Sequence, residues 1–192
     1  MRILTLLLLT AALHAQPSLL TIREIDAGSV AIKLDSTNIV NKDSSLHLRW
    51  LPINDASCPV QLGDFGLRIR YRGSRGFLFG IAGQAAATQD IAAAEIVMVL
   101  YDLWGRYIRT LSYLTISPAR QGAELSLDGT EWVEDHDSER FMTTVSYVDH
   151  VRLANGKIWK ANLPAVLAKV NTAELKLSEA QLAPSTDRKS VV

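Results

Sequence analysis

The segment AEIVMVLYDLWGRYIRTLSYL, residues 94–114, constrains the fold more than any other part of the sequence. Its first half is a run of apolar and aromatic residues that only Asp102 interrupts. In the sequence DLWG an aspartate holds the first position and Gly105 the fourth, which are preferences of a type I turn. The segment therefore predicts a β-hairpin with a three-residue loop and a left-handed Gly105. The register expected from this turn pairs Asp102 with Arg106, Tyr101 with Tyr107, and Leu100 with Ile108.

Both faces of this hairpin are largely apolar. Successive side chains of a strand point to opposite faces, so each face can be read from the sequence. One face, which we assign to the core, carries Ile96, Met98, Leu100, Ile108 and Leu114. The other face carries Val97, Val99, Tyr101, Tyr107, Arg109, Leu111 and Tyr113. This second face is too apolar to be left in water, so it is covered either by another part of the chain or by a partner protein.

An amphipathic helix is the candidate cover within the chain. Residues 163–183 hold the long helical pattern of the sequence, and Pro164 suits a first helical turn. Its apolar positions, spaced i, i+3, i+4 and i+7, are Leu163, Val166, Leu167 and Val170. We expect this helix to pack on the second face of the hairpin. If a partner covers that face instead, the candidate interaction surface is Tyr101, Tyr107, Arg109 and Tyr113.

Short runs of β-branched and aromatic residues alternate with turn signals along the rest of the chain. This spacing is typical of an antiparallel sandwich or barrel. Strands that alternate with long helices are absent, which argues against a doubly wound sheet. The predicted fold is mainly β: an antiparallel immunoglobulin-like β-sandwich with a C-terminal α-helix. The predicted strands are residues 20–26, 29–35, 46–51, 66–71, 76–82, 95–102, 106–115, 123–128, 141–153 and 157–161.

The N-terminal residues 1–15 have the pattern of a secretory signal peptide. Arg2 precedes a predominantly apolar run, residues 3–13, and small residues follow. That run is too short to cross a bilayer core of about 30 Å as a helix. Cleavage after Ala15 would leave Gln16 as the first residue, and cleavage after Ala12 is the alternative. We therefore expect an exported protein, periplasmic or extracellular, with no transmembrane segment in the mature chain.

The domain organisation follows from these patterns. A chain of 192 residues favours one domain. We expect the β-sandwich domain over residues 16–162, the C-terminal helix over residues 163–183, and a flexible tail over residues 184–192.

Charge and cysteine content restrict the classes of partner and site. Lys plus Arg and Asp plus Glu both number 20, so no net field attracts nucleic acid or anionic lipid. We expect no nucleic-acid partner and no cofactor. Cys58 is the single cysteine, so the fold rests on its apolar core without an internal disulfide. The neighbouring Pro59 and Val60 favour a buried free thiol over a thiol paired with another chain.

A second hairpin is predicted at VRLANGKIW, residues 151–159. Asn-Gly between apolar alternations is a strong hairpin signal, because both turn residues can take a positive φ. A two-residue loop would place Leu153 opposite Ile158 and Arg152 opposite Trp159. The guanidinium over the indole would then be either an ordinary structural pair or a platform on which a ligand stacks.

Two segments carry groups that could do chemistry. Residues 131–140 contain His136 and five carboxylates: Glu131, Glu134, Asp135, Asp137 and Glu139. Clustered oxygens and a histidine can hold calcium or zinc, but the EF-hand order is missing, so a solvated acidic loop is the favoured interpretation. Asp149 and His150 interrupt an apolar strand. Adjacent residues of a regular strand point apart, so the two side chains meet only if a β-bulge occurs there.

The sequence MVLYD, from Met98 to Asp102, followed by a turn and GRYIRTL, resembles the FxLYD family of small extracytoplasmic domains. Leu100, Tyr101 and Asp102 match the motif, and Met98 replaces its leading phenylalanine. The resemblance extends at most over residues 66–127. It implies an immunoglobulin-like sandwich in a bacterial or archaeal extracytoplasmic protein, and it supplies no catalytic residues.

Two functional hypotheses follow. The first is a non-enzymatic binding or assembly module of the cell envelope, whose partner is another envelope protein. The second is a small exported hydrolase with a site assembled from distant His, Asp and Glu residues. The sequence contains no Gly-x-Ser-x-Gly, His-Glu-x-x-His, P-loop or dinucleotide fingerprint, so no catalytic or metal residue is assigned and the non-enzymatic module is favoured.

Overall fold

A computed structural model describes residues 20–29, 32–34, 38–40, 47–71, 77–102, 104–133 and 141–182. The predicted signal peptide, residues 1–15, and the predicted tail, residues 184–192, lie outside the described residues. The described part is mainly β-strand, with mostly antiparallel pairing and a C-terminal helix, which confirms the predicted fold class. The immunoglobulin-like arrangement of the strands stays a prediction.

The strands form one large and two smaller sheets. The path of the large sheet is β1 (Leu20–Ile22), β5 (His47–Asp55), β11 (Phe141–Leu153), β8 (Ile91–Asp102) and β9 (Tyr107–Thr115). Off this path, β2 (Ile25–Ser29) pairs with β5 and β12 (Ile158–Lys160) pairs with β11. The second sheet has the order β10 (Glu124–Val133), β7 (Phe77–Ala87) and β6 (Val60–Tyr71), and β3 (Ile32–Leu34) pairs with β4 (Asn38–Val40).

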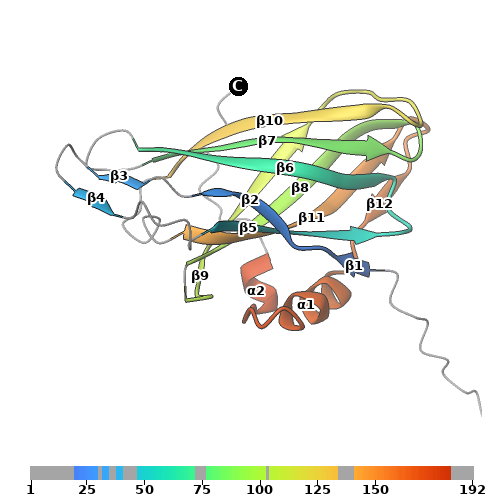
Figure 1. The fold of residues 1–192 in the computed structure, drawn as a ribbon. Helices are drawn as coiled ribbons and strands as arrows, with labels where there is room; N and C mark the ends of the chain where they lie inside the picture. The colour runs from blue at the N-terminus through green and yellow to red at the C-terminus, as the bar shows by residue number, and fades with distance from the viewer. Residues whose placement is uncertain are drawn as a thin grey trace, which may run out of the picture.

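The elements lie in three layers (Figure 1). The sheet of β6, β7 and β10 lies on one face of the large sheet, and the helices α1 (Leu163–Asn171) and α2 (Glu179–Leu182) lie on the other. The two sheets share an inner core, whose members include Trp50, Leu62, Ile96, Met98, Leu100, Leu127 and Val148. The large sheet and the helical segment share an outer core, whose members include Ile53, Val97, Val99, Tyr101, Val145, Tyr147, Val166 and Val170. The large sheet is therefore apolar on both faces, as the opening sequence required.

One strand pair departs from the antiparallel prediction. β5 and β11 run parallel, with a register from Arg49 opposite Thr143 to Ile53 opposite Tyr147. Parallel neighbours need a crossover connection, and here the chain between them passes through both main sheets. Turn spacing alone does not determine which distant strands pair, so the sequence could not show this.

The turn of the first hairpin has the predicted chemistry. The Asp102 amide donates to the Arg106 carbonyl oxygen at 2.9 Å, and Gly105 has a φ of 71°. The Asp102 carboxylate accepts hydrogen bonds from the backbone amides of Trp104 and Arg106, both at 2.8 Å. Tyr101 lies opposite Tyr107, as expected. The side chain of Asp102 is buried because it replaces water as the partner of these amides.

The register beyond this turn differs from the prediction. An irregularity after Tyr101 places Leu100 opposite Arg109 instead of Ile108. A one-residue shift exchanges the two faces of a strand. Leu111 therefore belongs to the inner core with Met98, and Tyr113 packs against the same core opposite Ile96. Leu114, predicted in the core, lies opposite Glu95 and is 59% exposed.

The second hairpin is also shifted by one residue. The Leu153 amide donates to the Lys157 carbonyl oxygen at 2.9 Å, so the loop has three residues and only Gly156 has a positive φ, 84°, within it. Arg152 lies opposite Ile158, and Val151 lies opposite Trp159. The predicted pair of Arg152 and Trp159 is therefore wrong. Trp159 packs against the inner core instead.

The predicted C-terminal helix is shorter than its pattern and broken in two. Asn162 caps α1 by accepting a hydrogen bond from the Ala165 amide, and Pro164 lies in the first turn. After α1 the chain turns through Glu174, which has a φ of 62°, and buries Leu175 and Leu177 in the outer core before α2. Leu175 and Leu177, in a segment that is neither helix nor strand, therefore cover the same apolar face that a longer helix would have covered.

The predicted packing of the C-terminal helix on the second face of the first hairpin is confirmed. Val166 and Val170 are buried with Val97, Val99 and Tyr101 in the outer core, and Leu167 packs against it. Burying a Val side chain contributes about 1.5–3 kcal/mol, so this short helix is a substantial part of the fold's stability.

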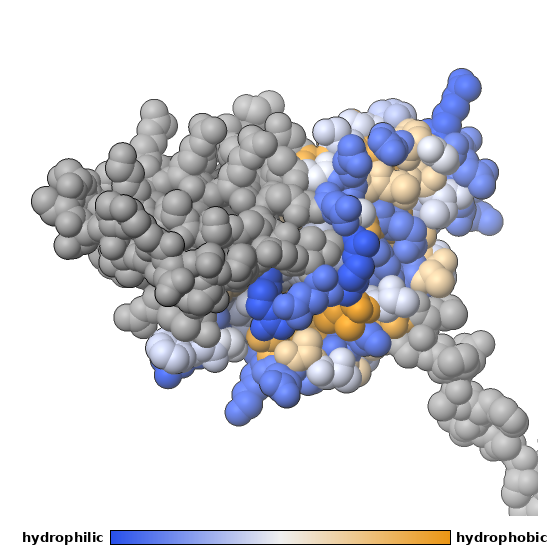
Figure 2. Space-filling view, viewed as in Figure 1, coloured by the Kyte–Doolittle hydropathy of each residue, from blue (hydrophilic) through white to orange (hydrophobic). Residues whose placement is uncertain are grey.

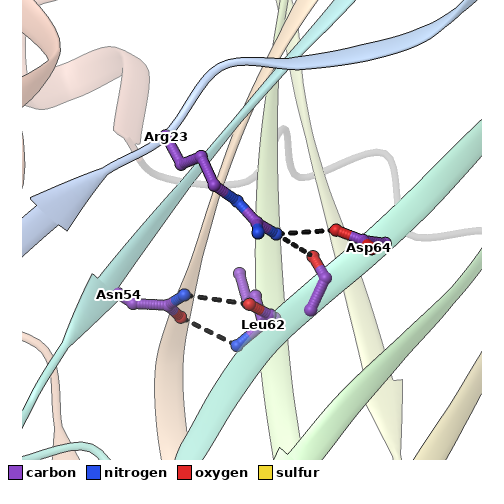
Figure 3. A network of polar contacts seen from close by, with 5 residues as sticks. Arg23, Asn54, Leu62 and Asp64 are labelled. Carbon is purple, nitrogen blue, oxygen red and sulfur yellow. Dashed lines mark hydrogen bonds and ion pairs between the residues drawn. The ribbon is translucent and has the colours of Figure 1, made fainter.

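Polar contacts also join the two main sheets at one edge (Figure 3). The side-chain amide of Asn54 in β5 donates to the Leu62 carbonyl oxygen at 2.9 Å and accepts from the Leu62 amide at 2.7 Å. These two bonds satisfy both backbone groups of Leu62 on β6, which is the end strand of the second sheet. Arg23 lies beside them and contacts the Asp64 carboxylate at 2.7 Å (Figure 3). The Arg23–Asp64 pair is exposed, so it contributes little to stability.

Cys58 is a buried free thiol, as predicted. It lies in the inner core and is 2% exposed. Burial raises the pKa of the Cys58 thiol from an ordinary value of 9.0 to about 12. The thiol therefore stays protonated at neutral pH, which does not suit a nucleophile.

Candidate functional site

A bulge in β11 brings two polar side chains to one face of the large sheet. The register of β11 against β8 shifts between Val148 and His150, which leaves Asp149 as the extra residue. Val148 and Val151 both lie in the inner core, whereas Tyr147 lies in the outer core. Asp149 and His150 therefore share the outer face, and the bulge predicted from their position is confirmed.

Glu95 of β8 completes the group. Glu95 lies directly opposite His150 in the register. His150 Nδ1 is 2.8 Å from Asp149 Oδ2 and 3.7 Å from Glu95 Oε2. All three residues are half-buried, and one ligand atom from each lies within 4.8 Å of the other two. The three side chains, from two strands far apart in the sequence, form what we call the acidic–histidine cluster: Glu95, Asp149 and His150.

Neighbouring hydroxyls contact or surround this cluster. The Ser112 hydroxyl of β9 donates a hydrogen bond to Glu95 Oε1, which fixes that carboxylate. The Tyr147 hydroxyl donates to the Leu182 carbonyl oxygen of α2 at 3.4 Å. Burial raises the pKa of Tyr147, and the negative charges of Asp149 and Glu95 raise it further. Tyr147 is therefore a neutral wall of the site at physiological pH.

The cluster lies where the helical cover ends. The Thr110 hydroxyl donates to the Gln181 carbonyl oxygen of α2, so the cover reaches that point of β9. Further along the same face Leu114 is 59% exposed, and Ile116, which follows the end of β9, is 76% exposed. On the other side of the cluster Ile158 of β12 is 55% exposed. We call this uncovered end of the sheet the open face, and its members are Glu95, Leu114, His150, Arg152, Ile158 and Lys160.

The residues predicted as an interaction surface do not form one surface. Tyr101 is fully buried under the helical segment, and Tyr107 packs against the same outer core. Arg109 lies opposite Leu100 on the inner side, and Tyr113 packs against the inner core. Burial raises the pKa of Tyr101, so it remains a neutral core residue. The exposed apolar side chain of this hairpin that lies on the outer face is instead Leu114, at the end far from the turn.

The predicted acidic segment lies mostly outside the described residues. Glu131 lies within β10, and the positions from 134 to 140 are not described. The candidate metal ligands from that segment therefore have no structural account here.

Enclosed space near the site is small. A cavity of about 10 Å³ lies among Leu20, Ile53, Cys58, Tyr147 and Val166. That volume holds at most about one water molecule. The chemistry available to this part of the chain is therefore at its surface, on the open face.

Comparison of the chain with protein-family models, with curated proteins and with solved structures finds no match. Among the described residues no helix has the length and apolar character needed to cross a membrane.

Sequence reasoning found two of the three cluster residues. Asp149 and His150 stood out because they interrupt an apolar strand, but Glu95 and Ser112 were not singled out. Glu95 carried a signal, since it is the single charged residue between Ile91 and Tyr101 and shares the alternation of Val97 and Val99. That signal pointed to the same outer face, but only the pairing of β8 with β11 brings it to His150.

Proposed function

We propose that this protein is an exported, non-enzymatic binding or assembly module of the cell envelope. It engages another envelope protein through the open face. The observation that carries this proposal is the distribution of exposed apolar side chains. Of the four large hydrophobic side chains that are exposed in the described part of the chain, Leu114 and Ile158 lie on the open face by their strand registers, and Ile116 follows two residues after Leu114.

On the face of the molecule drawn in Figure 2, described hydrophobic residues occur as small separate patches in a mainly hydrophilic surface. Apolar residues that gather at one end of a sheet, rimmed by charges, are typical of protein-binding sites.

The charges on the open face indicate the chemistry of the partner. Arg152 lies opposite the exposed Ile158, and Lys160 follows two residues later. Both cations are exposed. We therefore expect a partner surface that presents apolar side chains next to carboxylates, because complementary charge sets orientation and association rate.

Two features of the sequence support the export part of the proposal. Residues 1–15 have the n-region, apolar run and small residues of a secretory signal. The segment from Met98 to Asp102 resembles the motif of extracytoplasmic FxLYD domains. A bacterial envelope is the setting that we propose.

The test is site-specific photocrosslinking in the cells that export the protein. A photoreactive residue replaces Ile158 in one variant and Trp104 in a control. Trp104 is a 67% exposed apolar side chain at the hairpin tip, away from the open face, so it controls for crosslinking through exposed apolar positions in general. We expect one protein to be crosslinked through position 158 and not through position 104. The same captured set at both positions, or none at 158, would contradict the proposal.

The captured pair is then tested with purified proteins. Leu114→Lys combined with Ile158→Lys should weaken binding at least about tenfold, because two apolar contacts are replaced by desolvated charges. Trp104→Lys should leave the Kd unchanged. Crosslinking to a second copy of this chain would mean that the open face is a homodimer interface and would reject a separate partner.

A hydrolase is the second candidate function. It is favoured by one observation: Glu95, Asp149 and His150 come together from separate strands. The Ser112 hydroxyl donates to Glu95 and not to His150. This arrangement lacks the histidine base that would activate a serine nucleophile. Hydrolysis would therefore have to proceed through an activated water. Turnover of ester, phosphoester or peptide substrates that His150→Ala abolishes would support this candidate over the binding module.

A further inference from the structure

We propose that the acidic–histidine cluster binds one divalent transition-metal ion, with Zn²⁺ as the ion of best fit. His150 Nδ1 and one carboxylate oxygen each from Asp149 and Glu95 are the ligands. The inference does not depend on the proposed partner or on any hydrolytic activity.

The distances fit a metal centre after small movements. Ligands about 2.0–2.1 Å from a tetrahedral zinc ion lie about 3.3 Å from one another. The observed distances from His150 Nδ1 are 2.8 Å to Asp149 Oδ2 and 3.7 Å to Glu95 Oε2. One contact has to lengthen and the other to shorten by less than 1 Å. Side-chain rotation supplies such movements without any change in the strands.

A second, independent observation concerns the histidine nitrogen itself. His150 Nδ1 is buried and has no hydrogen-bond partner among the described residues. Asp149 Oδ2 is close to it, but the contact does not have hydrogen-bond geometry. In the tautomer that carries its proton on Nε2, the Nδ1 lone pair faces two carboxylates, which repel it. A cation between the three atoms converts that repulsion into three ligand bonds.

The ligand types select the metal. Imidazole nitrogen suits zinc and other first-row transition metals, whereas Ca²⁺ and Mg²⁺ prefer all-oxygen sites with more ligands. Three protein ligands leave a fourth coordination position of a zinc ion for water or another donor. The cluster lies on the open face, so that position is accessible from solvent.

Ser112 has a supporting role in this site. Its hydroxyl donates to Glu95 Oε1, the oxygen that does not face His150. This bond orients the carboxylate toward the metal position. Outer hydrogen bonds of this kind change metal affinity by about 10–100-fold when they are removed.

Isothermal titration of the metal-free mature protein with ZnCl₂ tests the inference. We expect one Zn²⁺ per chain, and no comparable binding of CaCl₂. His150→Ala and Glu95→Gln should each weaken Zn²⁺ binding more than Ser112→Ala, which should weaken it about tenfold. Glu124→Gln is the matched control, because Glu124 is an exposed carboxylate on the other sheet. Thermal melting without metal checks that each variant is folded.

Co²⁺ provides a spectroscopic readout in addition to the binding affinity. Co²⁺ bound in a four-coordinate site with one imidazole should show intense visible absorption bands that His150→Ala removes. Failure of the wild type to bind Zn²⁺, or equal binding by His150→Ala, would overturn the inference. Ile158→Lys should keep Zn²⁺ binding, because Ile158 lies opposite Arg152 and not opposite a proposed ligand, so the metal site and the partner surface can fail separately.

Discussion

Burial changes the chemistry of single side chains in this protein, and Cys58 is the clearest case. The thiol lies in the inner core, and burial raises its pKa to about 12. We expect a thiol reagent to label Cys58 slowly in the native state and quickly after unfolding. Labelling at the rate of a free thiol at pH 8, or a disulfide-linked dimer on a non-reducing gel, would contradict the burial.

The same pKa shift predicts how stability changes in alkali. A thiol whose pKa is higher in the folded than in the unfolded chain stabilises the fold fully below pH 9, and the contribution is lost as the pH rises toward 12. The free energy of unfolding should fall by about 1.4 kcal/mol per pH unit in that range. Denaturant titrations of wild type and Cys58→Ala at pH 8 to 10 measure this. The onset near pH 9 should be missing in the variant, while Tyr101 and Tyr147, whose pKa values are also raised, act above pH 10.

Asp102 has a structural role that a single substitution can isolate. Its carboxylate accepts from two backbone amides in the first hairpin turn. Asp102→Ala should lower the free energy of unfolding by about 1 kcal/mol, because it removes the shared acceptor of two part-buried hydrogen bonds. Asp102→Asn keeps the accepting oxygen and should cost less than half as much. Equal effects of the two substitutions in urea denaturation would show that the charge, and not the hydrogen bonds, is the important property.

At the scale of the element, α1 shows how much a short helix contributes. Its buried residues Val166 and Val170 cover Val97 and Val99 of β8. Val170→Ala should lower the free energy of unfolding by about 2 kcal/mol, from lost apolar burial and a small cavity. Ala168→Ser on the exposed side of the same helix should change it by less than about 0.5 kcal/mol. Chemical denaturation of both variants is the measurement.

Removal of the whole helical segment is the stronger form of this test. A chain that ends at Ala161 should unfold or associate through the exposed outer face of the large sheet. A truncated chain that stays monomeric with an unchanged Tm would show that the helices are not the cover.

The elements show which features the sequence could predict. The apolar alternation of β8 predicted both of its faces, and the Asp-His pair predicted the bulge of β11. The turn residues predicted the two hairpins, but the observed register of each differs from the prediction by one residue. In the first hairpin the cause is an irregularity near Tyr101, and in the second it is a three-residue loop that contains Gly156. These irregularities depend on packing and not on local propensity, so the far half of β9 was assigned to the wrong face. The position of Glu95 beside His150 needed the pairing of distant strands, which no local pattern contains.

At the scale of the molecule, the signal-peptide pattern of residues 1–15 makes one further prediction. N-terminal sequencing of exported protein should start at Gln16, or at Leu13 if cleavage follows Ala12. Exported material that begins at Met1 would contradict the signal peptide and, with it, the proposed location.

The parallel pairing of β5 with β11 has a consequence for how the chain acquires its structure. Arg49 and Thr143 pair although they lie far apart in the sequence. The strand β11 also joins β8 to the rest of the large sheet. A topology dominated by such distant contacts folds slowly, because the chain loses loop-closure entropy before the stabilising contacts form. A newly made chain therefore cannot complete its central sheet until residue 147 has emerged from the ribosome. For a protein that is proposed to cross a membrane before it folds, slow closure keeps the polypeptide threadable during export.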